Sequence, residues 1–120
     1  MAAPAVVWFE VTGKDGSGLQ AFYRDLFGWA IEDPGDGSGY GLVKAADKGI
    51  AGGIGSSQDG GAGAVTFYVE VDDPQAYLAR AEALGGRTVV PPTELAQFGL
   101  TFAFFTDPEG HMVGLSKGAV

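Results

Sequence analysis

The chain contains no cysteine and a single histidine among its 120 residues. It can therefore form no disulfide, it has no thiolate ligand for zinc, and it has no cysteine nucleophile. Because the single histidine, His111, is expected at a turn, we expect no Ser-His-Asp arrangement. The missing cysteines fit a cytoplasmic protein, which is the localisation that we expect.

Positive charge is also scarce. Seven Lys and Arg residues stand against fifteen Asp and Glu residues, which gives a net charge of −8. Nucleic-acid binding depends on clustered cations, so we expect no nucleic-acid partner. A neutral or cationic small molecule suits this surface better, although the acidity can also serve only to keep the protein in solution.

Long apolar runs are absent although 46% of the residues are hydrophobic. No run approaches the roughly 18 residues that a membrane span requires, so we expect no membrane association. No basic segment followed by an apolar one opens the chain as a secretion signal would. The length predicts one domain over residues 1–120.

The two halves of the sequence resemble each other when residue i is placed over residue i+58. "WFEV" at 8–11 then matches "TFYV" at 66–69, and "YGLV" at 40–43 matches "FGLT" at 98–101. Nine positions are identical without a gap, all at apolar or turn positions. The pattern predicts two modules, about 5–56 and 64–118, joined by the Gly- and Ser-rich stretch 55–63.

Each half shows the same local pattern. A β-branched and aromatic run opens it and predicts a strand. A helix follows, with apolar residues spaced three and four apart: Leu19, Phe22, Tyr23 and Leu26 in the first half, and Tyr77, Leu78, Ala81 and Leu84 in the second. Asp73 is expected to cap the second helix, with Pro74 in its first turn. Further strands are expected at 29–32, 40–45, 49–54, 87–90, 100–106 and 111–116. The order β-α-β-β-β occurs twice, so the predicted fold class is α+β.

Two sheets that each carry one helix leave one face of each sheet uncovered, and we expect these faces to form an open cleft. Strand alternation assigns Phe9, Val11, Val43, Ala45, Phe67 and Val69 to the helix-covered faces. The opposite phase carries many aromatic side chains. The candidate ligand-binding residues are Trp8, Glu10, Tyr40, Leu42, Thr66, Tyr68, Phe98, Phe102, Phe104, Met112 and Gly114, with Lys44, Glu70 and Leu100 in the same phase.

Several stretches together resemble the vicinal oxygen chelate superfamily, which includes glyoxalase I, extradiol dioxygenases and bleomycin-resistance proteins. They are "WFEV" followed by "LQAFYRDLFGW", then "TFYVEVDDPQAYLARAEALGGRTVVPPTE", and finally "FAFFTDPEGHMVGL". The resemblance covers nearly the whole chain. It implies paired βαβββ modules around an open cleft, in agreement with the repeat.

Enzymes of that superfamily bind a divalent metal through side chains on the first and last strands of each module. The resemblance places these positions at Trp8, Thr66 and Gly114, and none of the three is a strong ligand. The last strand of the first module, within 49–57, offers only two serine hydroxyls. We therefore expect no metal and no cofactor. His111 lies three residues before Gly114, after an Asp-Pro-Glu-Gly turn, and we interpret it as a turn residue without a catalytic role.

The resemblance is to the antibiotic-binding, metal-free members, which hold compounds such as bleomycin or enediynes. The aromatic residues favour sequestration of a hydrophobic, ring-containing natural product, with a role in antibiotic resistance. The alternative is a cofactor-free lyase or isomerase with Glu10 as base and Tyr68 as proton donor. A third possibility is a non-catalytic accessory or structural subunit. We expect a homodimer. The sequence does not identify the ligand or decide whether catalysis occurs. It also does not decide whether the modules pair within one chain or between two.

Overall fold

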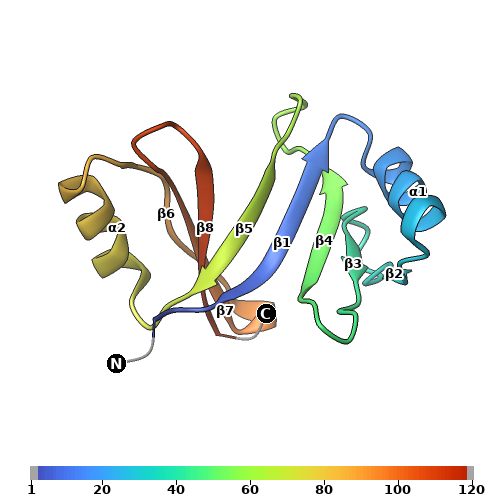
Figure 1. The fold of residues 1–120 in the computed structure, drawn as a ribbon, viewed down its shortest axis with the longest axis horizontal. Helices are drawn as coiled ribbons and strands as arrows, with labels where there is room; N and C mark the ends of the chain where they lie inside the picture. Colours follow the sequence, from blue (N-terminus) through green and yellow to red (C-terminus); the bar gives the residue numbers. More distant parts are fainter. Residues whose placement is uncertain (1–2, 119–120) are drawn as a thin grey trace. The chain divides into compact units, whose positions relative to one another are not determined.

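The computed structural model describes residues 3–118. They divide into two compact units, one comprising residues 8–65 and the other comprising residues 3–7 together with 66–118. Below, the unit of residues 8–65 is the N-terminal unit and the other is the C-terminal unit. Each contains one α-helix beside strands, as Figure 1 shows.

The N-terminal unit contains one βαβββ set, except for the first two residues of its first strand, which belong to the C-terminal unit. Its elements are β1 (Val6–Gly13), α1 (Gly16–Phe27), β2 (Ile31–Glu32), β3 (Gly41–Val43) and β4 (Ala51–Ser56). The strand order is β2-β3-β4-β1. Strand β1 pairs in parallel with β4, whereas β2, β3 and β4 are antiparallel neighbours.

The C-terminal unit repeats this arrangement. Its elements are β5 (Val65–Glu70), α2 (Pro74–Ala83), β6 (Arg87–Leu95), the short 3₁₀ helix η1 (Ala96–Phe98), β7 (Leu100–Thr106) and β8 (Met112–Gly118). The order is β5-β8-β7-β6, with β5 parallel to β8 and the other pairs antiparallel. The predicted α+β class and the repeated βαβββ order are confirmed.

Side chains at the helix ends fix where the helices begin and end. The Asp15 carboxylate accepts from the Gly18 N–H at 3.0 Å at the start of α1, and Gly28 ends that helix with φ of 71°. Asp73 caps α2 by accepting from Ala76 at 3.2 Å, and Pro74 occupies the first turn. The cap that the sequence predicts at Asp73 is confirmed.

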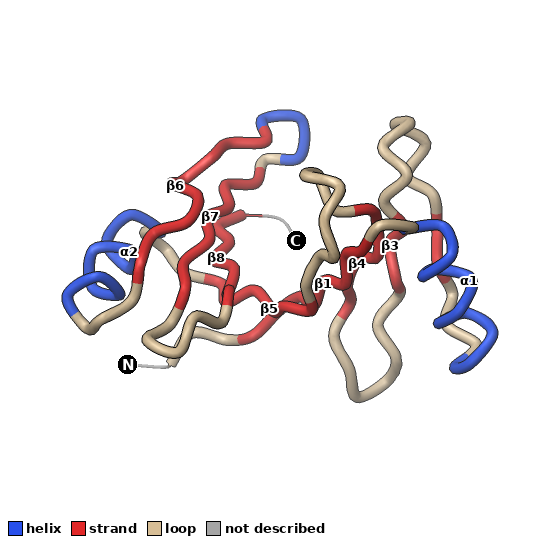
Figure 2. The backbone as a smooth tube through the Cα atoms, turned by 90° about the horizontal axis from the view of Figure 1, so that it is seen from above, coloured by secondary structure: helices blue, strands red, loops and turns tan. Residues whose placement is uncertain are grey.

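Each helix covers one face of its sheet over a small apolar core. In the N-terminal unit, Val11, Val43 and Ile54 are buried beneath α1, and five partly buried residues pack around them: Phe9, Leu19, Tyr23, Trp29 and Ile31. In the C-terminal unit, Val71, Leu78, Ala103 and Leu115 are buried, with Val69, Tyr77 and Phe105 around them. Figure 2 shows α2 beside β6 and α1 beside the strands of its own unit. The predicted helix-facing phase of β1, β3 and β5 is confirmed at Phe9, Val11, Val43 and Val69.

Three of the residues predicted on the buried helix faces are exposed instead, and for these the prediction is wrong. Phe22 and Leu26 are 58% and 57% exposed, because α1 rests on its sheet along the line of Leu19 and Tyr23. Leu84 is 75% exposed because it is the capping residue after the last turn of α2 rather than a residue of that turn.

Three strand predictions also need correction. Strand β3 ends at Val43, where its pairing with β2 and β4 ends, so Ala45 is exposed instead of packing on α1. Strand β6 runs on to Leu95, with irregular register where Pro91 and Pro92 cannot donate to the ladder. Phe67 lies in the predicted phase but is 43% exposed and outside the core.

Within residues 3–118, neither α-helix has the length and apolar character needed to cross a membrane.

Candidate functional site

The uncovered face of the N-terminal sheet carries a line of hydrogen-bonded side chains. The Trp8 indole N–H donates to the Tyr40 hydroxyl at 3.1 Å, and that hydroxyl donates to the Glu10 carboxylate at 2.9 Å. Trp8 and Glu10 alternate with the core residues Phe9 and Val11 along β1, so their side chains lie on the face opposite α1. The predicted common face of Trp8, Glu10 and Tyr40 is therefore present.

Glycine in β4 makes this line possible. Gly53 is the pairing partner of Glu10 on β1, and a Cβ at Gly53 would overlap the Tyr40 phenol. The Tyr40 ring thus lies directly over the backbone of β4 on its way to β1. A Cβ at Gly55, the next glycine on this face, would also lie close to the Tyr40 ring.

The environment keeps Tyr40 protonated. Burial of the phenol and the neighbouring Glu10 carboxylate raise the pKa of Tyr40 well above its ordinary value of 10.0. The hydroxyl of a neutral Tyr40 donates a hydrogen bond to the Glu10 carboxylate and accepts one from the Trp8 indole N–H. The three groups therefore form a directed chain that ends at a carboxylate.

Leu42 and Lys44 follow Tyr40 at alternate positions. Leu42 pairs with Gly53 and is half-buried. The Lys44 ammonium lies 3.1 Å from the Glu32 carboxylate, and both side chains are exposed. An exposed pair of this kind contributes little to stability, so Lys44 marks a polar end of this face.

The uncovered face of the C-terminal sheet carries a cluster of aromatic rings. The Tyr68 and Phe104 ring centroids lie 5.4 Å apart and those of Phe102 and Phe104 lie 5.8 Å apart, both edge-to-face. Gly114 lies beneath Tyr68, because a Cβ there would press against the Tyr68 ring. We call Tyr68, Phe102 and Phe104 the aromatic cluster. The sequence predicted these three rings on one face.

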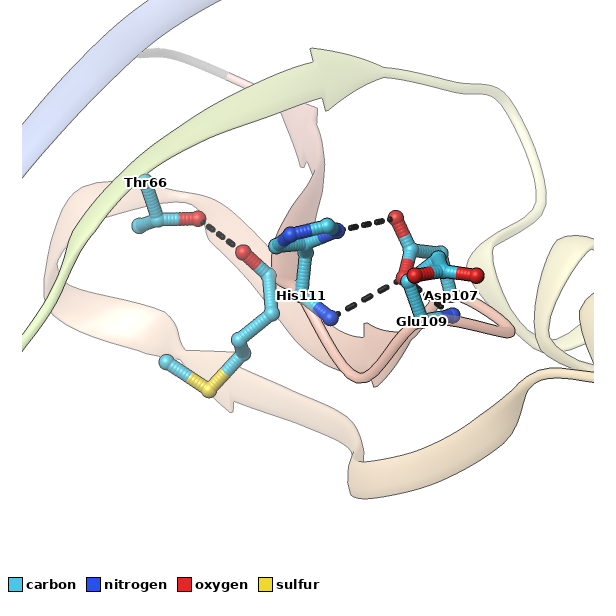
Figure 3. Close-up of polar contacts among 5 residues, drawn as sticks. Thr66, Asp107, Glu109 and His111 are labelled. Carbon is cyan, nitrogen blue, oxygen red and sulfur yellow. Dashed lines mark hydrogen bonds and ion pairs between the residues drawn. The ribbon is translucent and has the colours of Figure 1, made fainter.

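Thr66 and Met112 lie at the end of this face where β8 begins. The Thr66 hydroxyl is buried and donates to the Met112 carbonyl oxygen at 2.6 Å (Figure 3). Its proton is therefore used within the protein, which makes Thr66 a structural link between β5 and β8.

The positions at which the resemblance implies metal ligands do not fit a metal. Trp8 offers an N–H that is already donated to Tyr40, Thr66 donates to Met112, and Gly114 has no side chain. On the last strand of the first set, the Ser56 hydroxyl accepts from Gly16 N–H and the Ser57 hydroxyl, just after it, donates to the Gly61 carbonyl. Nowhere among residues 3–118 do three His, Cys, Asp or Glu side chains gather as a metal site.

His111 belongs to the turn between β7 and β8. The Asp107 carboxylate accepts from the backbone N–H groups of Glu109 and His111, both at 2.9 Å, and lies 3.0 Å from His111 Nδ1 (Figure 3). These contacts, with the His111 backbone bond first, lower the pKa of Asp107 below its ordinary value. The His111 side chain is 75% exposed. The arrangement is that of a turn residue, as the sequence predicts.

Phe98 is not on a strand of the face that carries the aromatic cluster, contrary to the prediction, and one residue of that face was missed. Phe98 is in η1, not in a strand, and is 51% exposed, because Gly99 turns the chain with φ of 63° before β7 begins. Ser116 lies two residues beyond Gly114 and so on the same face, and it is 1% exposed. The alternation of β8 could have identified Ser116.

A separate depression lies on the helix-covered side of the N-terminal unit. It has a volume of about 680 Å³ and is lined by the end of β1, the first turns of α1, and Ala62 and Val65. Its apolar lining includes Leu19, Phe22 and Tyr23. None of the residues predicted to bind ligand lines it.

Comparison with known proteins shows that the sequence matches a known family. The sequence model of the glyoxalase-like domain matches residues 8–115. The anthracycline biosynthesis protein DnrV of Streptomyces peucetius is 31% identical over 126 residues, covering 91% of this chain and 45% of DnrV. The putative glyoxylase CFP32 of Mycobacterium tuberculosis is 30% identical over 115 residues, covering 90% of this chain and 43% of CFP32. The chain thus spans about half the length of these curated relatives.

A solved structure shows the same fold. A glyoxalase/bleomycin resistance protein/dioxygenase superfamily member from Vibrio splendidus superimposes with a TM-score of 0.67, over 96% of this chain and 99% of the other. The two sequences are 14% identical, so this likeness concerns the fold alone.

Proposed function

The chain belongs to the glyoxalase-like domain family, and we propose that its function is to bind a hydrophobic, ring-containing natural product without metal. The observation that carries this proposal is the aromatic cluster on the uncovered face of the C-terminal sheet. Tyr68, Phe102 and Phe104 are each half-buried, so parts of their rings are accessible to a ligand. Each added ring contact contributes roughly 0.5–1.5 kcal/mol beyond the area that it buries.

The acidic composition agrees with a neutral or cationic ligand, and one relative takes part in anthracycline biosynthesis according to its name. A role in drug sequestration, as in antibiotic resistance, is the specific form of the proposal. Such a role requires no nucleophile, base or metal. The side chains at the family's metal positions, described above, support it because they are poor ligands.

A second candidate is a cofactor-free lyase or isomerase. The observation that favours it is the hydrogen bond between Tyr40 and Glu10, which holds a carboxylate in a fixed orientation on the N-terminal sheet. In this proposal Glu10 removes a proton from a bound substrate. The relative CFP32 is named a putative glyoxylase.

One experiment separates the two functions. The protein is incubated with a panel of polycyclic natural products, complexes are detected by native mass spectrometry, and the bound compound is recovered and analysed by chromatography. Sequestration predicts stoichiometric complexes from which the compound is recovered unchanged. A converted product whose formation stops in Glu10→Gln would instead establish the enzyme.

A further inference from the structure

Ser116 is a buried polar residue to which the fold gives no partner. It is 1% exposed, and among residues 3–118 its hydroxyl has no hydrogen-bond partner. Buried hydroxyl groups are nearly always hydrogen-bonded, because leaving one unsatisfied costs stability. A buried hydroxyl without a partner therefore requires an explanation.

The position of Ser116 places it beside the aromatic cluster. It pairs with Phe102 on β7 and with Glu70 on β5. Its neighbour Leu115 is in the helix-covered core, so alternation puts the Ser116 side chain on the uncovered face with Gly114. Ser116 is thus the hydroxyl set directly next to the rings proposed to stack on a ligand.

We propose that Ser116 is a specificity-determining residue whose hydroxyl donates to a carbonyl oxygen on an aromatic ligand. This inference rests on the proposed binding function and names the ligand class more narrowly, as aryl ketones and quinones. A carbonyl oxygen in the plane of a fused ring accepts a hydrogen bond in that plane. The same ring can then stack on the aromatic cluster while its edge meets Ser116.

Access to the hydroxyl requires a neighbouring side chain to move, since Ser116 is almost fully buried. Its pairing partners on the adjacent strands are Phe102 on β7 and Glu70 on β5, and a ligand would reach the hydroxyl when one of these side chains turns aside. Rotamer changes of this size are common on binding. The Phe102 ring, which belongs to the aromatic cluster, would then pack against the ligand.

The test compares two probes that differ only in the carbonyl groups, 2-(aminomethyl)anthraquinone and 2-(aminomethyl)anthracene. Both are cationic and have three fused rings. Affinities are measured by calorimetry for the wild type, Ser116→Ala and the control Ser17→Ala. Ser17 is exposed at the start of α1, where its hydroxyl donates to Asp15.

We expect Ser116→Ala to weaken binding of the anthraquinone about fivefold, as for one lost hydrogen bond, and to change binding of the anthracene less than about twofold. Ser17→Ala should alter neither affinity. The melting temperature of Ser116→Ala should be no lower than that of the wild type, because no bond within the protein is lost.

Two different failures are distinguishable. If the wild type binds both probes and Ser116→Ala changes both affinities by the same factor, the role of Ser116 is overturned and the binding function stands. If the wild type binds neither probe, the binding function and the inference drawn from it both fail. A melting temperature that falls in Ser116→Ala would show that the hydroxyl is bonded within the protein, which also overturns the inference.

Discussion

At the scale of single residues, the N-terminal unit has three hydrogen-bonded side chains, Trp8, Tyr40 and Glu10, on its uncovered face. Where the family resemblance places a ligand, Trp8 donates its N–H to Tyr40, which in turn donates to Glu10. The indole edge is thereby fixed, while its faces can stack on a ring. Orientation by Tyr40 reduces the entropy that Trp8 would lose on binding.

Trp8→Ala should therefore weaken ligand binding by about 2 kcal/mol, roughly thirtyfold in dissociation constant, as for a buried aromatic residue at a binding hot spot. Trp8→Phe, which keeps a ring and loses the N–H, should retain most of the affinity. The measurement is calorimetric titration, with circular dichroism to verify folding. Unchanged affinity in a folded Trp8→Ala would leave its ring as packing alone.

Tyr40 should make stability depend on pH in the alkaline range. The pKa of Tyr40 is raised in the folded state, so its contribution to stability is complete below the unfolded value of about 10 and is lost as pH rises above it. Between about pH 9 and 11, the free energy of unfolding should fall more steeply for the wild type than for Tyr40→Phe. Denaturant titrations at several pH values measure both slopes, and equal slopes would contradict a perturbed Tyr40.

At the scale of elements, the glycines of β4 and β8 are as important as the aromatic residues. Gly53 lies beneath Tyr40 and Gly114 beneath Tyr68, so each tyrosine ring packs on bare backbone. A side chain in either place would push the ring away from the sheet. The small residues thus set the position of the rings on both uncovered faces.

Gly53→Ala should displace the Tyr40 phenol and break its bonds to Trp8 and Glu10. Overpacking of this kind costs typically about 1–3 kcal/mol of stability. Gly49→Ala is the control, because a Cβ at Gly49 meets only ordinary contacts. Thermal unfolding of both variants tests the expectation, and a Gly53→Ala protein as stable as the control would show that Tyr40 does not need the bare strand.

The sequence predicts which helices and strands form better than it predicts how these elements pack against one another. Capping by Asp73 and the phase of Val11, Val43 and Val69 depend on local pattern, and all were confirmed. The exposure of Phe22 could not be predicted, because it depends on the line along which α1 meets its sheet. The bond from Trp8 to Tyr40 joins residues 32 positions apart and follows from the register of β1 with β4, which periodicity does not specify. Ser116 was missed although it alternates with Met112 and Gly114 along β8, because the prediction for this strand rested on aromatic rings and ligand positions and not on a small hydroxyl.

At the scale of the whole molecule, the family match covers residues 8–115, and the curated relatives are about twice as long as this chain. Both βαβββ units keep large apolar side chains exposed, including Phe22, Leu26 and Phe27 in one and Leu84 in the other. Phe22, Leu26 and Phe27 all belong to α1, and exposed apolar groups close together on one element favour association.

The homodimer expected from the sequence is therefore our prediction for the isolated chain. A specific dimer interface buries about 1,200–2,000 Å² in total, which exposed apolar groups of this number can help to supply. One chain has a mass of 12.3 kDa. Multi-angle light scattering at micromolar concentration should give twice that mass. A single species at the mass of one chain would contradict the prediction.

The central claim is that the aromatic cluster on the C-terminal sheet binds a planar ring, and calorimetric titration with 2-(aminomethyl)anthraquinone tests it most directly. Wild type, Phe104→Ala and Phe22→Ala are compared, since Phe104 is in the cluster and Phe22 is an exposed ring on α1. The account predicts saturable binding by the wild type, about tenfold weaker binding by Phe104→Ala, and wild-type affinity for Phe22→Ala. Absence of saturable binding by the wild type, or affinities of the two variants that fall equally, would contradict it.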